Sequence, residues 1–196
     1  RSVGTAANTA KTRSALLESE ERKIYNLYLW IFNSSGNVEC SREYSRADLI
    51  QAATDLTTST GEVDADAPTS MGLLKNISLT TGKKTLFLLA NYKSDADGLF
   101  HVEPEVLNGI SKYSDLEKVR AAMTVHTLFR PNGNLLMSLT QTVTVSTATK
   151  QIEVSLKRSE AKITLNLQTI AGLTFEPGTY RLGNVPGSTF IAEHAK

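Results

Sequence analysis

The stretch Ile24–Phe32 constrains the fold most strongly because it is apolar at both odd and even positions. Successive side chains of a β-strand point to opposite faces of the sheet. One face would carry Tyr28, Trp30 and Phe32, and the other would carry Tyr25, Leu27, Leu29 and Ile31. Such a strand belongs in the middle of a sheet that is covered on both surfaces. A buried helix segment is the alternative, but the aromatic residues, the charged residues before the stretch and the turn Asn33–Asn37 favour a strand.

The first two thirds of the chain are predicted to contain further strands joined by short helices. Val38–Tyr44 is the expected hairpin partner of the first strand, and Lys75–Leu79 pairs with Thr85–Asn91, a second strand that is apolar on both faces. A capping box at Ser45–Asp48 predicts a helix over 46–54, followed by a polar loop over 55–72. The region 103–125 reads as a partly helical crossover. It has a proline at the first position of a helical turn and a capping box at Ser114–Glu117, followed by the apolar stripe Leu116, Val119 and Met123.

The last third is predicted to be nearly all strand. Residues 135–146 and 151–168 have strand patterns, and in the second of these the buried parity changes between Leu156 and Ala161. A regular strand cannot change its buried face, so a bulge or bend is expected at 157–160. The segment 178–191 reads as strand, turn and strand. Together these patterns predict an all-β protein with a few short helices, folded as a Greek-key β-sandwich.

Composition narrows the range of functions. The 196 residues are 40% hydrophobic and 21% charged, which is typical of one globular domain. A formal net charge of +1 argues against a nucleic-acid partner, because such proteins carry a concentrated basic face. The single cysteine, Cys40, cannot form an internal disulfide and reads as a half-buried strand residue. The longest apolar runs are much shorter than the roughly 20 residues that a membrane helix needs.

No arrangement of residues indicates catalysis, a cofactor or a metal site. The three histidines, His101, His126 and His194, lack the spacing of metal ligands. The acidic stretches Glu62–Asp66 and Asp95–Gly98 lack the remaining ligands of a calcium loop and read as solvated loops. Glycosylation sequons at 33–35 and 76–78 are too common to decide anything. The face with Tyr28 and Trp30 is predicted to be core and not a platform for a sugar.

Five pieces of the sequence, in this order, are similar to the N-terminal domain of the fimbrillins, the subunits of type V pili of Bacteroidales. They are Arg1–Gly4 before a polar linker, Ile24–Phe32 ending in Ser35-Gly36, Gly82–Asn91, Leu136–Ser138 followed by Leu156–Ile163, and Leu182–Phe190. Each piece alone is weak, but their order and spacing extend over nearly the whole chain.

This resemblance implies a transthyretin-like β-sandwich, exported as an outer-membrane lipoprotein precursor to the cell surface. It also implies that an Arg-specific protease cleaves between Arg1 and Ser2. The groove left by the removed strand would then accept a donor strand from the neighbouring subunit, which is β-augmentation. Residues 1–20 would be a flexible arm and 21–196 the N-terminal domain, with a second, C-terminal β-sandwich beyond this chain.

The expected function is therefore that of a structural fimbrial subunit with other fimbrial subunits as partners. The alternative is an accessory or tip adhesin that binds a host or bacterial glycan or protein on the same fold. An exposed aromatic cluster in the loops would favour the adhesin, and those loops offer only Phe100 and Tyr113. A subunit that lacks a strand should present an open groove or an unpaired sheet edge.

Overall fold

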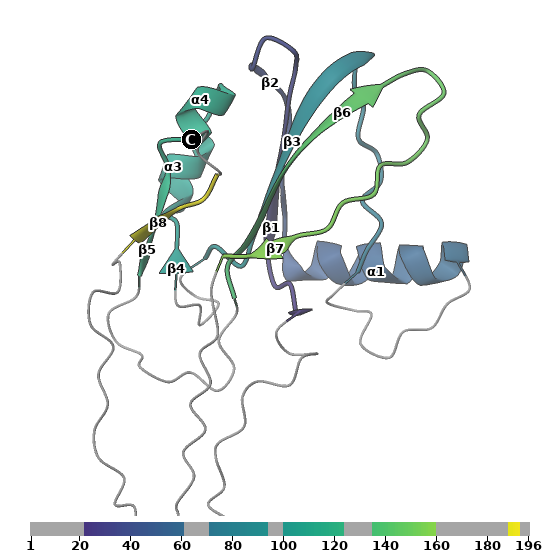
Figure 1. The fold of residues 1–196 in the computed structure, drawn as a ribbon. Helices are drawn as coiled ribbons and strands as arrows, with labels where there is room; N and C mark the ends of the chain where they lie inside the picture. Colours follow the sequence, from purple (N-terminus) through teal and green to yellow (C-terminus); the bar gives the residue numbers. More distant parts are fainter. Residues whose placement is uncertain (1–21, 61–70, 94–99, 124–134, 160–187, 193–196) are drawn as a thin grey trace, which may run out of the picture.

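The computed structural model describes residues 22–60, 71–93, 100–123, 135–159 and 188–192, and their strands form two antiparallel sheets (Figure 1). The larger sheet has the order β2-β1-β3-β6-β7 and the smaller has the order β4-β5-β8. The strands are β1 (Leu27–Phe32), β2 (Val38–Tyr44), β3 (Gly82–Ala90), β4 (Phe100–His101), β5 (Arg120–Met123), β6 (Met137–Val145), β7 (Lys157–Arg158) and β8 (Ser188–Phe190). The helices are α1 (Arg46–Thr60), α3 (Pro104–Asn108) and α4 (Tyr113–Leu116). The predicted class, an all-β sandwich with a few helices, is confirmed.

Both faces of the larger sheet are covered, as the sequence of β1 predicts. β1 lies between β2 and β3, and β3 lies between β1 and β6. Figure 1 shows the smaller sheet with α3 and α4 on one side of the larger sheet and α1 on the other. Two hydrophobic clusters result, one on each side, and the residues of β1 divide between them in strict alternation.

The first cluster lies between the two sheets. Trp30 and Phe32 from β1 and Phe87 and Leu89 from β3 are fully buried there against residues of the smaller sheet, α3 and α4. The Tyr28 ring stacks on Trp30 with centroids 3.8 Å apart. Because Trp30 is completely buried, this aromatic face is core, as predicted.

The second cluster is covered by α1 and by two segments without regular structure, 71–80 and 149–156. Leu27, Leu29 and Ile31 of β1 lie there with Leu86 and Leu88 of β3. The side chains of Leu74, Ile77, Leu79, Ile152 and Leu156 pack against this cluster. The predicted strand over 75–79 is therefore wrong, because β1 and β6 already occupy both sides of β3.

The helix after β2 is correctly placed but longer than predicted. Ser45 and Asp48 form the expected reciprocal cap, since the Ser45 N–H donates to Asp48 Oδ2 at 2.8 Å and the Asp48 N–H donates to Ser45 Oγ at 3.3 Å. The helix then runs to Thr60, so the predicted loop over 55–72 begins too early. Leu49 of the helix packs into the second hydrophobic cluster, and Ala52 and Ala53 are also buried.

The crossover between β3 and β6 leaves the larger sheet, forms part of the smaller one, and returns, as a Greek-key connection requires. The helical turn that begins at Pro104 is confirmed as α3. The capping box at Ser114–Glu117 and the stripe Leu116, Val119 and Met123 predict an amphipathic helix, and this prediction is wrong beyond one turn. The helix α4 begins after Lys112 and ends at Leu116, and the chain then extends into β5. Ala121 is fully buried in that strand, which pairs with β4 on one side and β8 on the other.

The last described strands agree with the predictions in part. Residues of the predicted strand over 135–146 form the continuous strand β6. The segment 151–156 is not a strand, and only Lys157 and Arg158 pair with β6 as β7. Several predictions lie outside the described residues: the arm 1–20, the loop 95–98, the part of the predicted bend beyond Ser159, and most of 178–191.

Candidate functional site

The edge of the larger sheet at β6 is the first part of the candidate site. β6 pairs with β3 along its whole length, from Met137 with Ala90 to Val145 with Gly82. On its other side β7 pairs only with Met137 and Ser138. Within the described part of the chain, Leu139–Val145 therefore has no second strand partner. An unpaired row of backbone N–H and C=O groups is a template for another strand.

The side chains of β6 suit the addition of a strand. The strand MSLTQTVTV contains no charged residue, glycine or proline, and it is rich in the β-branched residues threonine and valine. Leu139 and Val143 pack against the second cluster. Natural sheet edges are usually protected by charges, bulges or proline. The described residues show none of these devices along Leu139–Val145.

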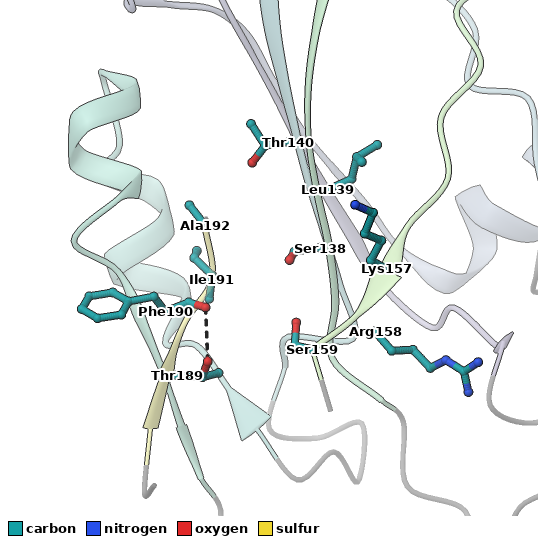
Figure 2. A pocket seen from close by; sticks show the side chains of 10 residues that line it. All are labelled: Ser138, Leu139, Thr140, Lys157, Arg158, Ser159, Thr189, Phe190, Ile191 and Ala192. Carbon is teal, nitrogen blue, oxygen red and sulfur yellow. Dashed lines mark hydrogen bonds between the residues drawn. The ribbon is translucent and has the colours of Figure 1, made fainter. Parts of the chain in front are cut away.

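A cleft opens beside this edge, between the larger sheet and β8 (Figure 2). Its volume is 340 Å³. Residues of β6, β7 and β8 and their neighbours line it, namely Ser138, Leu139, Thr140, Lys157, Arg158, Ser159, Thr189, Phe190, Ile191 and Ala192. In Figure 2, Thr140 lies on the side of β6 that faces Ile191 and Ala192, whereas Leu139 lies on the opposite side and the ring of Phe190 points away. Side chains of an added strand could therefore enter between the two sheets.

The opposite edge, at β2, is protected. The register between β1 and β2 shifts between Ile31 and Phe32, so that Glu39 is the extra residue of a β-bulge. Ser41, Arg42 and Glu43 follow as exposed residues. At the start of β2 the Val38 N–H donates to the Ser111 carbonyl at 2.9 Å, which covers that end. A bulge and charges at an edge oppose the addition of a strand.

The bulge also places Glu39 next to a buried cation. Lys84 of β3 is 2% exposed and forms an ion pair with Glu39, which is 15% exposed. Lys84 Nζ also donates to Thr80 Oγ1 at 2.6 Å, and Thr80 Oγ1 donates to Glu39 Oε1 at 2.8 Å. The hydrogen bond from Lys84 is the main cause that holds the pKa of Glu39 below its usual value. Through Thr80, this cluster ties the end of the segment 71–80 to β2 and β3.

The remaining candidate residues do not form a catalytic or metal-binding arrangement in the described ranges. Arg1 and Ser2 lie outside these ranges. Cys40 is half-buried on β2, as predicted. His101 lies on β4, with its Nε2 3.3 Å from Glu103 Oε1, while His126 and His194 are not among the described residues. Among the described residues no group of three or more His, Cys, Asp or Glu could hold a metal ion.

The two loop aromatics do not form an exposed platform. Phe100 and Tyr113 are half-buried and pack against the first cluster. The Tyr113 ring meets Phe32 edge to face, with centroids 5.4 Å apart. Phe100 and Tyr113 therefore do not form the exposed aromatic cluster that would favour the adhesin alternative. None of the described helices is long and apolar enough to cross a membrane.

Two antiparallel sheets with an open, uncharged edge define a β-sandwich suited to pairing with a strand of another molecule. Residues 2–178 match the family model described as major fimbrial subunit protein (FimA). The chain belongs to this family. The predicted recognition as a fimbrillin of the Bacteroidales is therefore confirmed. A search of the curated proteins found no match.

Two solved structures illustrate how far the overall likeness extends. The tip fimbrial protein Mfa3 from Porphyromonas gingivalis is 17% identical with a TM-score of 0.41, and the match covers 67% of this chain and 39% of that one. A fimbrial assembly protein from Parabacteroides distasonis is 13% identical with a TM-score of 0.41, and the match covers 74% of this chain and 49% of that one. This chain thus spans less than half of either relative. At these TM-scores the family assignment rests on the match over 2–178.

Proposed function

We propose that the chain is part of a structural subunit of a bacterial cell-surface fimbria, and that it polymerises by accepting a donor strand from a neighbouring subunit. The observation that carries this proposal is the unpaired edge of β6 beside the cleft to β8. Membership of the major fimbrial subunit family supports assembly with other fimbrial subunits and a location at the cell surface. The role is structural, and no catalytic step is part of it.

The geometry of β7 supports β6 as the accepting strand. β7 continues the larger sheet beyond β6 for two residues, and it runs antiparallel to β6. The segment before Lys157 does not pair with β6 as a strand: Ile152 and Leu156 pack against the second cluster, and the segment contacts the strand through the hydrogen bond from Gln141 Nε2 to the Glu153 carbonyl at 3.5 Å. An extended donor in line with β7 would pair with Leu139–Val145 and complete the row. Backbone hydrogen bonds would provide affinity, and alternate side chains of the donor would fill the cleft.

Processing before Ser2 is the proposed trigger. An Arg-specific protease would cut between Arg1 and Ser2 of a lipoprotein precursor and remove a leader together with the first strand. Support for this step comes from the Arg1–Gly4 motif of the family resemblance. We also propose that 1–20 is a flexible arm. The donor strand would come from a part of the neighbouring subunit that lies outside this domain.

Two lysine substitutions at matched positions test the proposal. Thr142 on β6 and Ser41 on β2 are both exposed hydroxyl residues on the same face of the larger sheet, one on each edge strand. The full-length precursor is treated with an Arg-specific protease and examined for SDS-resistant ladders. We expect wild type and Ser41→Lys to form ladders, and Thr142→Lys to form them at least 10-fold more slowly, because a lysine at an edge opposes strand addition. If wild type forms no ladder, the proposed polymerisation is wrong. If Thr142→Lys assembles like wild type, β6 is not the accepting strand.

A further inference from the structure

A buried asparagine joins three segments at the end of the larger sheet where the chain enters β1. The side chain of Asn91, directly after β3, is fully buried. Its Oδ1 accepts a hydrogen bond from the Tyr25 N–H at 2.8 Å, and its Nδ2 donates to the carbonyls of Lys23 and Leu135, both at 2.9 Å. The two amide hydrogens and the oxygen all have partners, so the amide orientation is fixed by its surroundings.

The backbone at this position strengthens the same junction. The Asn91 N–H donates to the Asn26 carbonyl at 3.0 Å, and the Tyr92 N–H donates to Asn26 Oδ1 at 3.0 Å. Asn91 has a φ of 59°, in the left-handed region that glycine, asparagine and aspartate tolerate best. Glycine would lose all three side-chain hydrogen bonds, and aspartate would turn an oxygen towards the two carbonyls. Among these residue types, asparagine alone fits both the backbone and its partners.

We infer that Asn91 is a positioning residue that couples the segment Lys23–Asn26 to the accepting strand β6. This inference rests on the proposed function, because only the proposed role of β6 gives the coupling a consequence. Lys23 and Tyr25 lie on the path from the processing site at Arg1 and Ser2, and Leu135 lies just before β6. One side chain therefore ties Lys23 and Tyr25, which follow the N-terminal arm in the sequence, to Leu135 before the strand that accepts the donor. Loosening either segment loosens the other.

Amide hydrogen exchange of the unassembled full chain tests the coupling without any donor strand. In Asn91→Gly the backbone conformation is retained and three hydrogen bonds are lost. We expect exchange in fragments covering 22–27 and 135–140 to rise together, by about 10- to 100-fold, as the loss of two or three ordinary hydrogen bonds predicts. Val119→Ala is the control for a general loss of stability. The temperature is chosen so that Val119→Ala and Asn91→Gly unfold at the same urea concentration. Fragments of β2 should then exchange no faster in Asn91→Gly than in Val119→Ala. Val119 is buried on the opposite side of the larger sheet from α1.

Asn76 provides the control for the backbone conformation. It has a φ of 60° but is exposed, so Asn76→Gly changes a left-handed asparagine without removing a buried junction. Asn76→Gly should leave exchange at both fragments unchanged. The inference is overturned if Asn91→Gly accelerates only one of the two fragments, or accelerates all strands equally. Because the exchange is measured before assembly, a failure of polymerisation leaves this test intact. If the wild type polymerises, SDS-resistant ladders of Asn91→Gly and of Val119→Ala should form at different rates. Equal rates would contradict the functional coupling.

Discussion

The ion pair between Glu39 and Lys84 leads to a prediction about which partner is more costly to lose. Lys84 is almost completely buried, whereas Glu39 retains contact with water and also accepts hydrogen bonds from the N–H and the hydroxyl of Thr80. Removing the carboxylate by Glu39→Gln leaves a buried ammonium without a counterion. Removing the cation by Lys84→Met leaves a carboxylate that is still hydrogen-bonded and partly hydrated. Loss of one partner from a buried pair costs about 3 to 5 kcal/mol when the other charge stays buried.

We therefore expect Glu39→Gln to lower the free energy of unfolding by about 3 kcal/mol and Lys84→Met to lower it by about 1 to 2 kcal/mol. The free energies come from urea unfolding of both single variants and of the double variant. The double variant should lose less than the sum of the two, because it leaves no uncompensated charge. If Lys84→Met costs as much as Glu39→Gln or more, burial of the ammonium does not control the energetics of this pair.

Three further predictions concern pH, an orphaned hydroxyl and a turn. The pKa of Glu39 is lowered in the folded state, so the contribution of its carboxylate to stability is present above the unfolded pKa and is lost as the pH falls below about 4.3. Urea unfolding should therefore show that the free energy of unfolding declines less from neutral to acid pH in Glu39→Gln than in wild type. The buried Tyr44 hydroxyl has no hydrogen-bond partner within the described ranges, so Tyr44→Phe should keep or raise the unfolding free energy, and a loss above about 1 kcal/mol would show that the hydroxyl is satisfied. Gly82 has a φ of 117°, so Gly82→Ala should lower the thermal midpoint, whereas Gly109→Ala, with the nearest atom 3.7 Å from the new Cβ, should leave it nearly unchanged.

The core of the fold could be predicted because β1 and β3 have apolar residues at both parities. A strand between two covered surfaces satisfies such a pattern, the aromatic residues and the following turn favour it over a buried helix, and the alternation of residues in β1 assigns each one to its hydrophobic cluster. The hairpin to β2 and the cap of α1 are local features, encoded by a turn and by the Ser45–Asp48 pair. These elements needed no knowledge of distant parts of the chain.

The errors arose where tertiary contacts override a local pattern. Lys75–Leu79 alternates like a strand, but its apolar residues cover a sheet surface because no free edge of β3 remains. The residues after Ser114 have helical spacing, yet pairing with β4 and β8 extends Arg120–Met123. In both places the competing partner lies far away in the sequence.

The candidate site was only partly accessible from the sequence. An unpaired edge could be expected, but its assignment to β6 depends on β7 being short and on the bulge in β2, which are relations between strands. Lys84 and Asn91 carry weak sequence signals: a lysine beside an apolar strand and an asparagine directly after one. Their partners Glu39, Lys23 and Leu135 are distant in the chain, so only the structure reveals their roles.

The most direct measurement is amide hydrogen exchange, compared between the polymer and the unassembled subunit. It tests whether a neighbouring molecule completes the larger sheet at β6. We expect Leu139–Val145 to become strongly protected on assembly, while the edge of β2 at Ser41–Glu43 exchanges as before. Unchanged exchange along β6, or new protection along β2 instead, would contradict it.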